Sequence, residues 1–223
     1  MDSKKYQAFV FDMDGTIVSS IEDIGDAVNY SLAFHGLPTR RMEEFPAFLG
    51  NGSVKLIERA LGDKNQAFFR KVFDTYYSYY LEHYCVKTHP YDGIVESLSL
   101  AKREGILLFV YTNKPESIAK EVSEHCFGKG FFDALVGIPL GGKVKPDPEA
   151  FQKAVMVPYG LDPRRCAYFG DSLTDIQTAH NLGIERMYAV SWGYVEKEKL
   201  LKGRPYRLLE RPEEIQDVVK GTI

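Results

Sequence analysis

Two aspartates separated by one residue follow the first apolar segment of the chain. Asp12 and Asp14 come directly after Ala8–Phe11, and a turn formed by Gly15 and Thr16 follows them. Two carboxylates about 4 Å apart repel each other by about 4 kcal/mol at an effective dielectric of 20. Burying them without a partner is costly as well. The pair therefore predicts a site for something cationic, such as a divalent metal that also holds a phosphoryl group.

Polar residues also follow a second apolar segment. Thr112 and Asn113 come after Ile106–Tyr111, and Lys114 is expected to point into a helical turn that begins at Pro115. A hydroxyl and an amide at the end of a parallel strand can hold a phosphoryl oxygen, and proline is tolerated at the first position of a helix. Because Thr-Asn before proline is also an ordinary way to begin a helix, this segment is weak evidence when taken alone.

A lysine and two more aspartates complete the set. Lys145 precedes a Pro-Asp-Pro sequence, which predicts a rigidly placed cation. Asp171 and Ser172 follow the apolar run Cys166–Phe169, and Asp175 lies one helical turn further on, so the two aspartates share one side of that helix. Magnesium prefers a few carboxylate oxygens together with waters and a phosphate oxygen. A helix cap would explain Asp171 or Ser172, but not the whole set.

Several short apolar runs read as strands that are buried on both faces. Their continuous apolar character predicts a parallel sheet covered by helices, and the helical patterns between them predict a doubly wound α/β domain. Right-handed crossovers then place the carboxyl ends of the strands along one edge, where such folds bind ligands. The expected strands are Ala8–Phe11, Ile106–Tyr111, Ala134–Ile138, Cys166–Phe169 and Met187–Ser191, and the expected helices are Gly93–Arg103, Glu116–Cys126, Pro148–Tyr159 and Leu173–Leu182.

Between the first strand and the rest of the core, the sequence shows only helical patterns. We expect residues 19–85 to form an all-helical cap domain, and residues 1–18 and 86–223 to form the α/β catalytic core. Aromatic residues recur at three- or four-residue steps in the last cap helix, and we interpret them as packing within the cap rather than as a substrate-binding surface. The expected cap helices are Ile21–Phe34, Arg41–Phe48, Val54–Leu61 and Gln66–Tyr84.

Composition narrows the class of protein. The 223 residues, with 44% hydrophobic and 26% charged content, fit a large domain or a core with an insert. The net charge of −3 does not indicate nucleic acid or an anionic membrane as a partner, and no apolar run approaches the ~20 residues that span a bilayer. The N-terminus does not resemble a signal peptide, and Cys85, Cys126 and Cys166 are widely spaced. We expect a cytoplasmic protein, either monomeric or homodimeric.

The four motifs, taken in order, resemble those of the haloacid dehalogenase (HAD) superfamily. They are Asp-x-Asp-Gly-Thr, Thr-Asn-Lys, Lys-Pro-x-Pro and Gly-Asp-Ser-x-x-Asp, and the likeness covers essentially the full length. A helical insert directly after the first motif is similar to the alpha-helical cap of the phosphoglycolate phosphatase and beta-phosphoglucomutase branch. Leu49-Gly50-Asn51-Gly52 and Trp192-Gly193-Tyr194 are similar to segments of bacterial phosphoglycolate phosphatases. The resemblance implies a Rossmann-like core with an inserted cap.

The resemblance also implies a role for each matching acidic residue. Asp12 would be the nucleophile that forms an aspartyl-phosphate, and Asp14 would act first as acid and then as base. Magnesium would bind the Asp12 carboxylate, the Asp14 backbone carbonyl and Asp171. Asp175, with Ser172 beside it, would orient the water shell of the metal.

Other matching residues would hold the substrate. Thr112, Lys145 and backbone amides near Asp14 and Gly15 would neutralise the phosphoryl oxygens. Lys145 would also pair with Asp12 and lower its pKa. The expected substrate-binding residues are Gly15, Thr16, Asn113, Gly50, Asn51 and Gly52, and the candidates for binding a substrate carboxylate are Arg41, Lys55 and Arg59.

These expectations favour a magnesium-dependent phosphatase that acts on a small phosphomonoester such as 2-phosphoglycolate. A sugar-phosphate mutase, a pyrophosphatase or a nucleotidase would share the same core motifs. Asp14 argues against a haloalkanoic acid dehalogenase, because that chemistry has no alkoxide to protonate. A non-catalytic protein that binds phosphate or a partner on this fold would be expected to lack Asp12 or Asp14, and both are present.

Overall fold

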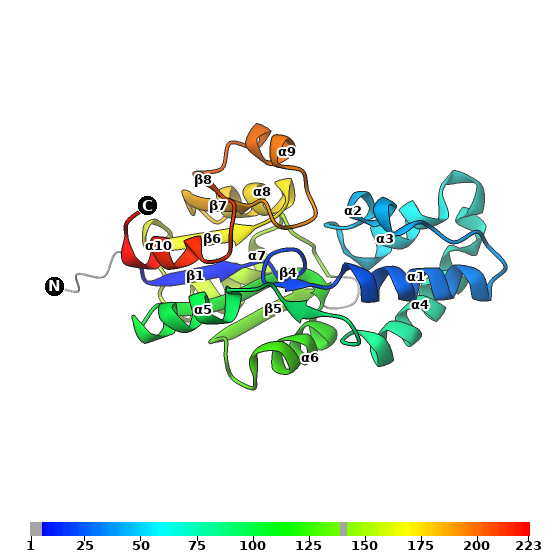
Figure 1. The fold of residues 1–223 in the computed structure, drawn as a ribbon, viewed down its shortest axis with the longest axis horizontal. Helices are drawn as coiled ribbons and strands as arrows, with labels where there is room; N and C mark the ends of the chain where they lie inside the picture. Colours follow the sequence, from blue (N-terminus) through cyan, green and yellow to red (C-terminus); the bar gives the residue numbers. More distant parts are fainter. Residues whose placement is uncertain (1–5, 139–141) are drawn as a thin grey trace.

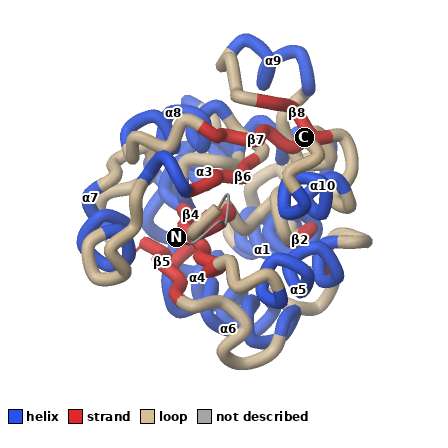
Figure 2. Tube along the Cα trace, turned by 90° about the vertical axis from the view of Figure 1, so that its left-hand side faces the viewer, coloured by secondary structure: helices blue, strands red, loops and turns tan. Residues whose placement is uncertain are grey.

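A six-stranded parallel sheet forms the centre of the computed structural model, which describes residues 6–138 and 142–223. Its strand order is β5-β4-β1-β6-β7-β8, so β1 lies between β4 and β6. Figure 2 shows β5, β4, β6, β7 and β8 following one another across the molecule. The predicted α/β class with a parallel sheet is confirmed. After β1, the chain adds β4 and β5 on one side of it and then β6, β7 and β8 on the other side. This change of direction places a topological switch point at the carboxyl end of β1. The strands are β1 Ala8–Phe11, β4 Leu107–Pro115, β5 Ala134–Ile138, β6 Cys166–Gly170, β7 Arg186–Val190 and β8 Arg207–Leu209.

Helices cover both faces of this sheet. Phe9 and Phe11 of β1 belong to one apolar cluster and Ala8 and Val10 to the other, and none of the four is exposed. This alternation explains the continuous apolar run, because each face needs its own apolar residues. Helices α5 Ile94–Arg103, α6 Glu116–Phe127 and α10 Glu214–Lys220 supply the first cluster, and α7 Glu149–Phe151, α8 Leu173–Asn181 and α9 Lys197–Lys202 supply the second.

A bundle of helices lies beyond the carboxyl ends of the core strands (Figure 1). The Ser31 hydroxyl of α1 donates a hydrogen bond to the Val72 carbonyl of α4 at 2.9 Å, which ties the two longest helices together. Tyr76 and Tyr80 of α4 are buried in the same apolar cluster, as the packing interpretation of the aromatic stripe expects. The helices are α1 Ile21–Phe34, α2 Phe45–Phe48, α3 Gly52–Leu61 and α4 Phe69–His83, with 3-10 turns at Met42–Glu44 and Asp63–Phe68.

Two short strands join this bundle to the core. β2 Val18–Ser19 pairs antiparallel with β3 His89–Pro90, so the chain enters and leaves the bundle side by side. Asp23, on the first turn of α1, is buried, and its carboxylate accepts four hydrogen bonds of 2.7–3.0 Å. The donors are the backbone N–H groups of Lys87 and Thr88 and the Thr88 hydroxyl. One carboxylate thus fixes both connecting segments.

The structure differs from the sequence-based expectations in three places. β4 continues to Pro115 instead of ending at Tyr111. The expected helix 148–159 is a single α-helical turn followed by the π-helix Gln152–Met156. The strands β2, β3 and β8 and helices α9 and α10 were not predicted, because they are too short to show a clear periodicity. Among the described residues, no helix combines the length and apolar character needed to cross a bilayer.

Replacing Asp23 with alanine should lower the free energy of unfolding by about 3 kcal/mol, because two buried donors of Thr88 and the partly buried Lys87 N–H lose a charged acceptor. Urea unfolding followed by circular dichroism measures the change. Asp26→Ala is the matched control, since the exposed Asp26 carboxylate pairs with Lys87 Nζ at the surface, and its loss should cost less than about 1 kcal/mol. Equal stability of the two variants would refute the role given to Asp23.

Candidate active site

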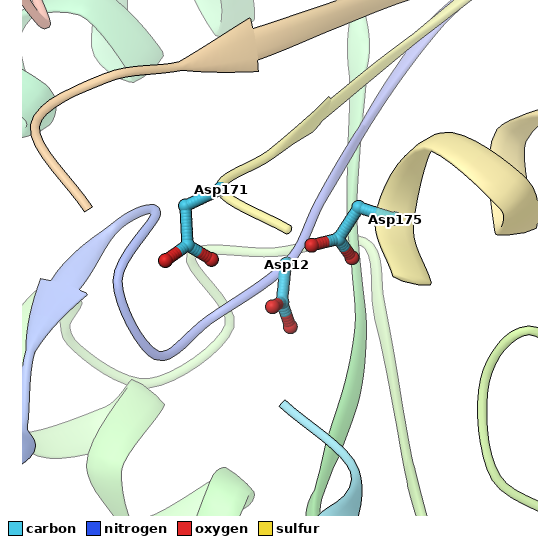
Figure 3. Close-up of side chains that lie close together, drawn as sticks. All are labelled: Asp12, Asp171 and Asp175. Atoms are coloured by element: carbon cyan, nitrogen blue, oxygen red, sulfur yellow. The ribbon is translucent and has the colours of Figure 1, made fainter. Parts of the chain in front are cut away.

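Three carboxylates meet at the carboxyl edge of the sheet. Asp12 follows β1, Asp171 follows the neighbouring strand β6, and Asp175 lies in the first turn of α8. One oxygen from each lies within 4.8 Å of the others (Figure 3). Parallel pairing sets this arrangement, because Phe11 and Phe169 are partners in register, β1 ends at Phe11, and β6 ends one residue further on at Gly170. The predicted convergence of distant segments is present in the structure.

A buried ammonium group separates two of these carboxylates. Lys145 Nζ lies 2.8 Å from Asp12 Oδ1 and 2.6 Å from Asp175 Oδ1, and the lysine side chain is only 2% exposed. Although burial opposes the charged form, the Asp12 and Asp175 carboxylates raise the pKa of Lys145 well above its usual value. The Asn113 side-chain carbonyl accepts a hydrogen bond from Lys145 N at 2.8 Å, so the second motif positions the lysine of the third.

Lys145 pairs with Asp12 and lowers its pKa, as expected, but other effects outweigh this and the net pKa of Asp12 is raised. Burial, and then the Asp175 carboxylate, raise the pKa of Asp12 to about 7, and the opposing effect of Lys145 is smaller. Burial and the neighbouring carboxylates also raise the pKa of Asp171 well above its usual value. One ammonium is too little positive charge for three buried carboxylates.

The remaining oxygens fit a divalent cation. Asp12 Oδ1 is buried and receives no hydrogen bond of ordinary geometry, although Lys145 Nζ is close to it. Both Asp175 oxygens are already used, because Oδ1 accepts from Lys145 and Oδ2 accepts from the backbone N–H and hydroxyl of Ser172. Asp12 and Asp171 are therefore the carboxylates free to bind a metal, with Asp175 supporting them. An all-oxygen set of this kind suits magnesium.

Glycine is required where the first motif passes Asp171. Gly15 has φ +83°, and a Cβ atom there would lie 2.3 Å from Asp171 Oδ2. The Tyr194 N–H donates to this same oxygen at 2.7 Å. Thr16 is fully buried, its carbonyl accepts from the Trp192 indole at 3.0 Å, and its hydroxyl has no partner among the described residues. Gly15 thus packs against Asp171, and neither Gly15 nor Thr16 lines the cavity of the site.

Asp14 is held by two donors on one of its oxygens. Lys114 Nζ lies 2.8 Å from Asp14 Oδ1, and the Ser20 hydroxyl donates to the same atom at 2.6 Å. Lys114 also donates to the Tyr80 hydroxyl at 2.7 Å. The expectation that Lys114 points into a helical turn is wrong, because β4 continues through this residue and directs its side chain into the interior.

A cavity of about 570 Å³ lies between this sheet edge and the helical bundle. Asp12, Asp14, Thr112 and Asp171 line it from the core. The turn between α2 and α3 lines it from the other side, and the Asn113 amide reaches across to donate to Gly50 O at 3.0 Å. The residues that line it from the bundle and were expected from the sequence are Gly50, Asn51, Gly52 and Arg59.

The three basic residues expected to bind a substrate carboxylate differ in position. Arg41 and Lys55 are exposed, pair with Glu44 and Glu58, and do not line the cavity. The Arg59 guanidinium lines it but donates to the Phe48 and Leu49 carbonyls and to Asn51 Oδ1 at 2.6–3.2 Å. Arg59 therefore holds the turn that covers the site.

Sequence reasoning missed Lys114, Tyr76 and Tyr80, all of which line the cavity. The aromatic residues were assigned to packing alone, but a buried phenol can pack on one side and offer its hydroxyl on the other. The signal for Lys114 was available, because a lysine that follows a strongly apolar strand is rarely buried without a partner.

This chain is similar in sequence to known phosphatases. A family model described as haloacid dehalogenase-like hydrolase matches residues 6–183. The phosphoglycolate phosphatase of Aquifex aeolicus is 31% identical over 217 residues, which cover 97% of this chain and 98% of that protein. The N-acetylmuramic acid 6-phosphate phosphatase of Pseudomonas aeruginosa is 29% identical and covers 89% of this chain and 87% of its own length.

Solved structures share the whole fold. A predicted phosphoglycolate phosphatase from Haemophilus somnus has a TM-score of 0.87 and 26% sequence identity, with 97% of this chain and 99% of that chain covered. The likeness therefore includes both the sheet and the inserted helices.

Replacing Lys145 with methionine should lower the free energy of unfolding by about 3 kcal/mol in the presence of a chelator, because the carboxylates lose their buried cation. The loss should be larger at pH 8 than at pH 6. When the pKa of a carboxyl group is higher in the folded than in the unfolded protein, a rise in pH ionises the buried group and lowers the free energy of unfolding. Denaturant unfolding at both pH values measures this, with the exposed Lys153→Met as control. A small loss that does not change with pH would contradict the charge balance.

Proposed function

This chain belongs to the haloacid dehalogenase-like hydrolase family, and we propose that it is a phosphatase that hydrolyses 2-phosphoglycolate or a similarly small phosphomonoester. The observation that carries the proposal is the meeting of Asp12, Asp14, Lys145 and Asp171 below one cavity at the sheet edge. A strong electrostatic site of this kind is what phosphoryl transfer demands of a protein.

We assign the covalent step to Asp12. A carboxylate oxygen attacks phosphorus, the bond between phosphorus and the ester oxygen breaks, and an aspartyl-phosphate forms. Asp14 gives a proton to the departing alkoxide. In the second step Asp14 removes a proton from water, and the water oxygen attacks phosphorus. The bond between phosphorus and the Asp12 oxygen breaks, which releases inorganic phosphate and restores the Asp12 carboxylate. The Ser20 and Lys114 contacts to Asp14 Oδ1 leave Oδ2 as the oxygen that faces these proton transfers.

Charge neutralisation falls to residues around the phosphoryl group. Lys145, Thr112 and the backbone amides near Asp14 and Gly15 are the groups that we propose to hold its oxygens. Asn113 serves this function indirectly, because its amide fixes Lys145 N on one side and Gly50 O on the other.

Magnesium is the cofactor that we propose. Asp12, Asp171 and the Asp14 backbone carbonyl would hold it, with Asp175 and Ser172 keeping the carboxylates in place. When bound, the metal supplies positive charge to the phosphoryl oxygens. The gathering of three carboxylates around one ammonium and the raised pKa values of Asp12 and Asp171 support a cation at this position.

The covering turn favours a small substrate. Gly50, Asn51 and Gly52 lie opposite the carboxylates and close the cavity on the bundle side. Relatives of this chain include both phosphoglycolate phosphatases and a phosphatase of N-acetylmuramic acid 6-phosphate, so a substrate panel should contain small phosphorylated acids and sugar phosphates together with nucleotides and pyrophosphate. Cys85, Cys126 and Cys166 are free thiols, which suits the cytoplasm as the compartment we propose.

Release of phosphate across this panel, with magnesium present, tests the function. The wild-type protein should hydrolyse 2-phosphoglycolate best, and Asp12→Asn should lower kcat at least about 1000-fold, because an amide is a poor nucleophile. Asp74→Asn, on the exposed surface of α4, is the matched control and should retain full activity. Turnover by Asp12→Asn at the wild-type rate would remove the proposal.

Magnesium should also raise the Tm of the protein without any substrate, since a ligand that binds only the folded state stabilises it. A thermal-shift titration measures this, and Asp171→Asn should remove most of the shift while Asp74→Asn keeps it. An identical shift in wild type and Asp171→Asn would place the metal elsewhere.

A further inference from the structure

Lys114 brings a second buried ammonium to the site, and it pairs with Asp14 rather than with Asp12. Its side chain is 2% exposed, and its ammonium contacts Asp14 Oδ1 at 2.8 Å and the Tyr80 hydroxyl at 2.7 Å. Lys114 and Tyr80 both line the cavity. The ammonium therefore lies at the junction of the core and the helical bundle.

An ammonium group can donate three hydrogen bonds. Among the described residues, Asp14 and Tyr80 are the hydrogen-bond partners of Lys114 Nζ. Asp14 Oδ1 is shared with the Ser20 hydroxyl, so the lysine does not have this acceptor to itself. One donor position of Lys114 is thus available to a molecule in the cavity.

The other cations near the cavity are already engaged. The Arg59 guanidinium donates to the turn at 48–51, and Lys145 is paired with Asp12 and Asp175. Lys199 lines the cavity, but its side chain is 61% exposed and pairs with Glu196. Of the cations near the cavity, Lys114 is the buried one that can bind a second anionic group of a substrate inside the cavity.

The position of the leaving group brings such an anion to Lys114. Asp14 must lie within about 3 Å of the ester oxygen in order to protonate it, and Lys114 Nζ lies 2.8 Å from the same carboxylate. In a 2-phosphoryloxy acid, a single carbon atom separates the ester oxygen from the carboxyl carbon. A carboxylate at that place is next to Lys114 and, without it, would face Asp14 with no cation to balance its burial.

We propose that Lys114, held in place by the Tyr80 hydroxyl, binds the carboxylate of the substrate and makes this site selective for phosphate esters with a carboxylate on the carbon beside the ester oxygen. This inference rests on the phosphatase function proposed above and narrows its substrate class. Tyr80 comes from the helical bundle, so the subsite is complete only when bundle and core are together.

The test compares 2-phosphoglycolate with 2-phosphoglycolamide, in which a neutral amide replaces the carboxylate, in wild type and in Lys114→Met. The two esters have the same size and differ in charge at the group that Lys114 is assigned to bind. Wild type should prefer the acid in kcat/KM, and Lys114→Met should lower that preference at least about tenfold, since a hydrogen bond to a charged group is lost. The preference is a ratio measured on one preparation, so incomplete folding of the variant cancels.

Two further variants complete the experiment. Tyr80→Phe removes the hydroxyl that holds the ammonium and should lower the preference in the same direction, which keeps the test usable if Lys114→Met does not fold. Lys199→Met, the exposed lysine at the same cavity, should change the preference by less than about twofold.

The outcomes separate the two proposals. An equal fall in kcat/KM for both esters in Lys114→Met would show that the lysine acts only through Asp14 and would overturn the carboxylate subsite. An unchanged preference would overturn it as well. A wild-type protein that hydrolyses neither ester, nor any other phosphomonoester of the panel, would instead refute the proposed function itself.

Discussion

The pairing of Lys145 with Asp12 and Asp175 is the interaction on which the rest of this site depends. Three carboxylates are buried where two parallel strands end, and burial alone would drive them toward the neutral form. The single ammonium balances only part of that charge. The remaining imbalance is the physical basis for the proposed binding of a further cation at this position.

The same charge requirement explains the loops around the sheet edge. Lys145 comes from a connection outside the sheet, so its backbone must be fixed from elsewhere, and Asn113 does this with its side-chain carbonyl. The amide of Asn113 also binds Gly50 O in the turn that covers the cavity. One side chain therefore links the position of the central cation to the position of the covering turn.

Lys114 is a second buried lysine that pairs with a carboxylate of the site. Lys114 lies between Asp14 and Tyr80, which connects the carboxylate proposed to transfer protons with a helix of the bundle. The two buried lysines pair with different carboxylates, so the proposed positions of the phosphoryl group and of the leaving group have separate cations.

The sequence by itself indicated which strand each motif follows, the parallel α/β class and the carboxylates Asp12, Asp14 and Asp171, because continuous apolar runs and the residues directly after them are local patterns. It also indicated Lys145. Only the tertiary structure decided the partners of Lys114, the structural use of Arg59 and Asn113, and the raised pKa of Asp12. These contacts and this pKa shift depend on burial and on distances between segments far apart in the chain, and the local spacing of residues in the sequence predicts neither quantity.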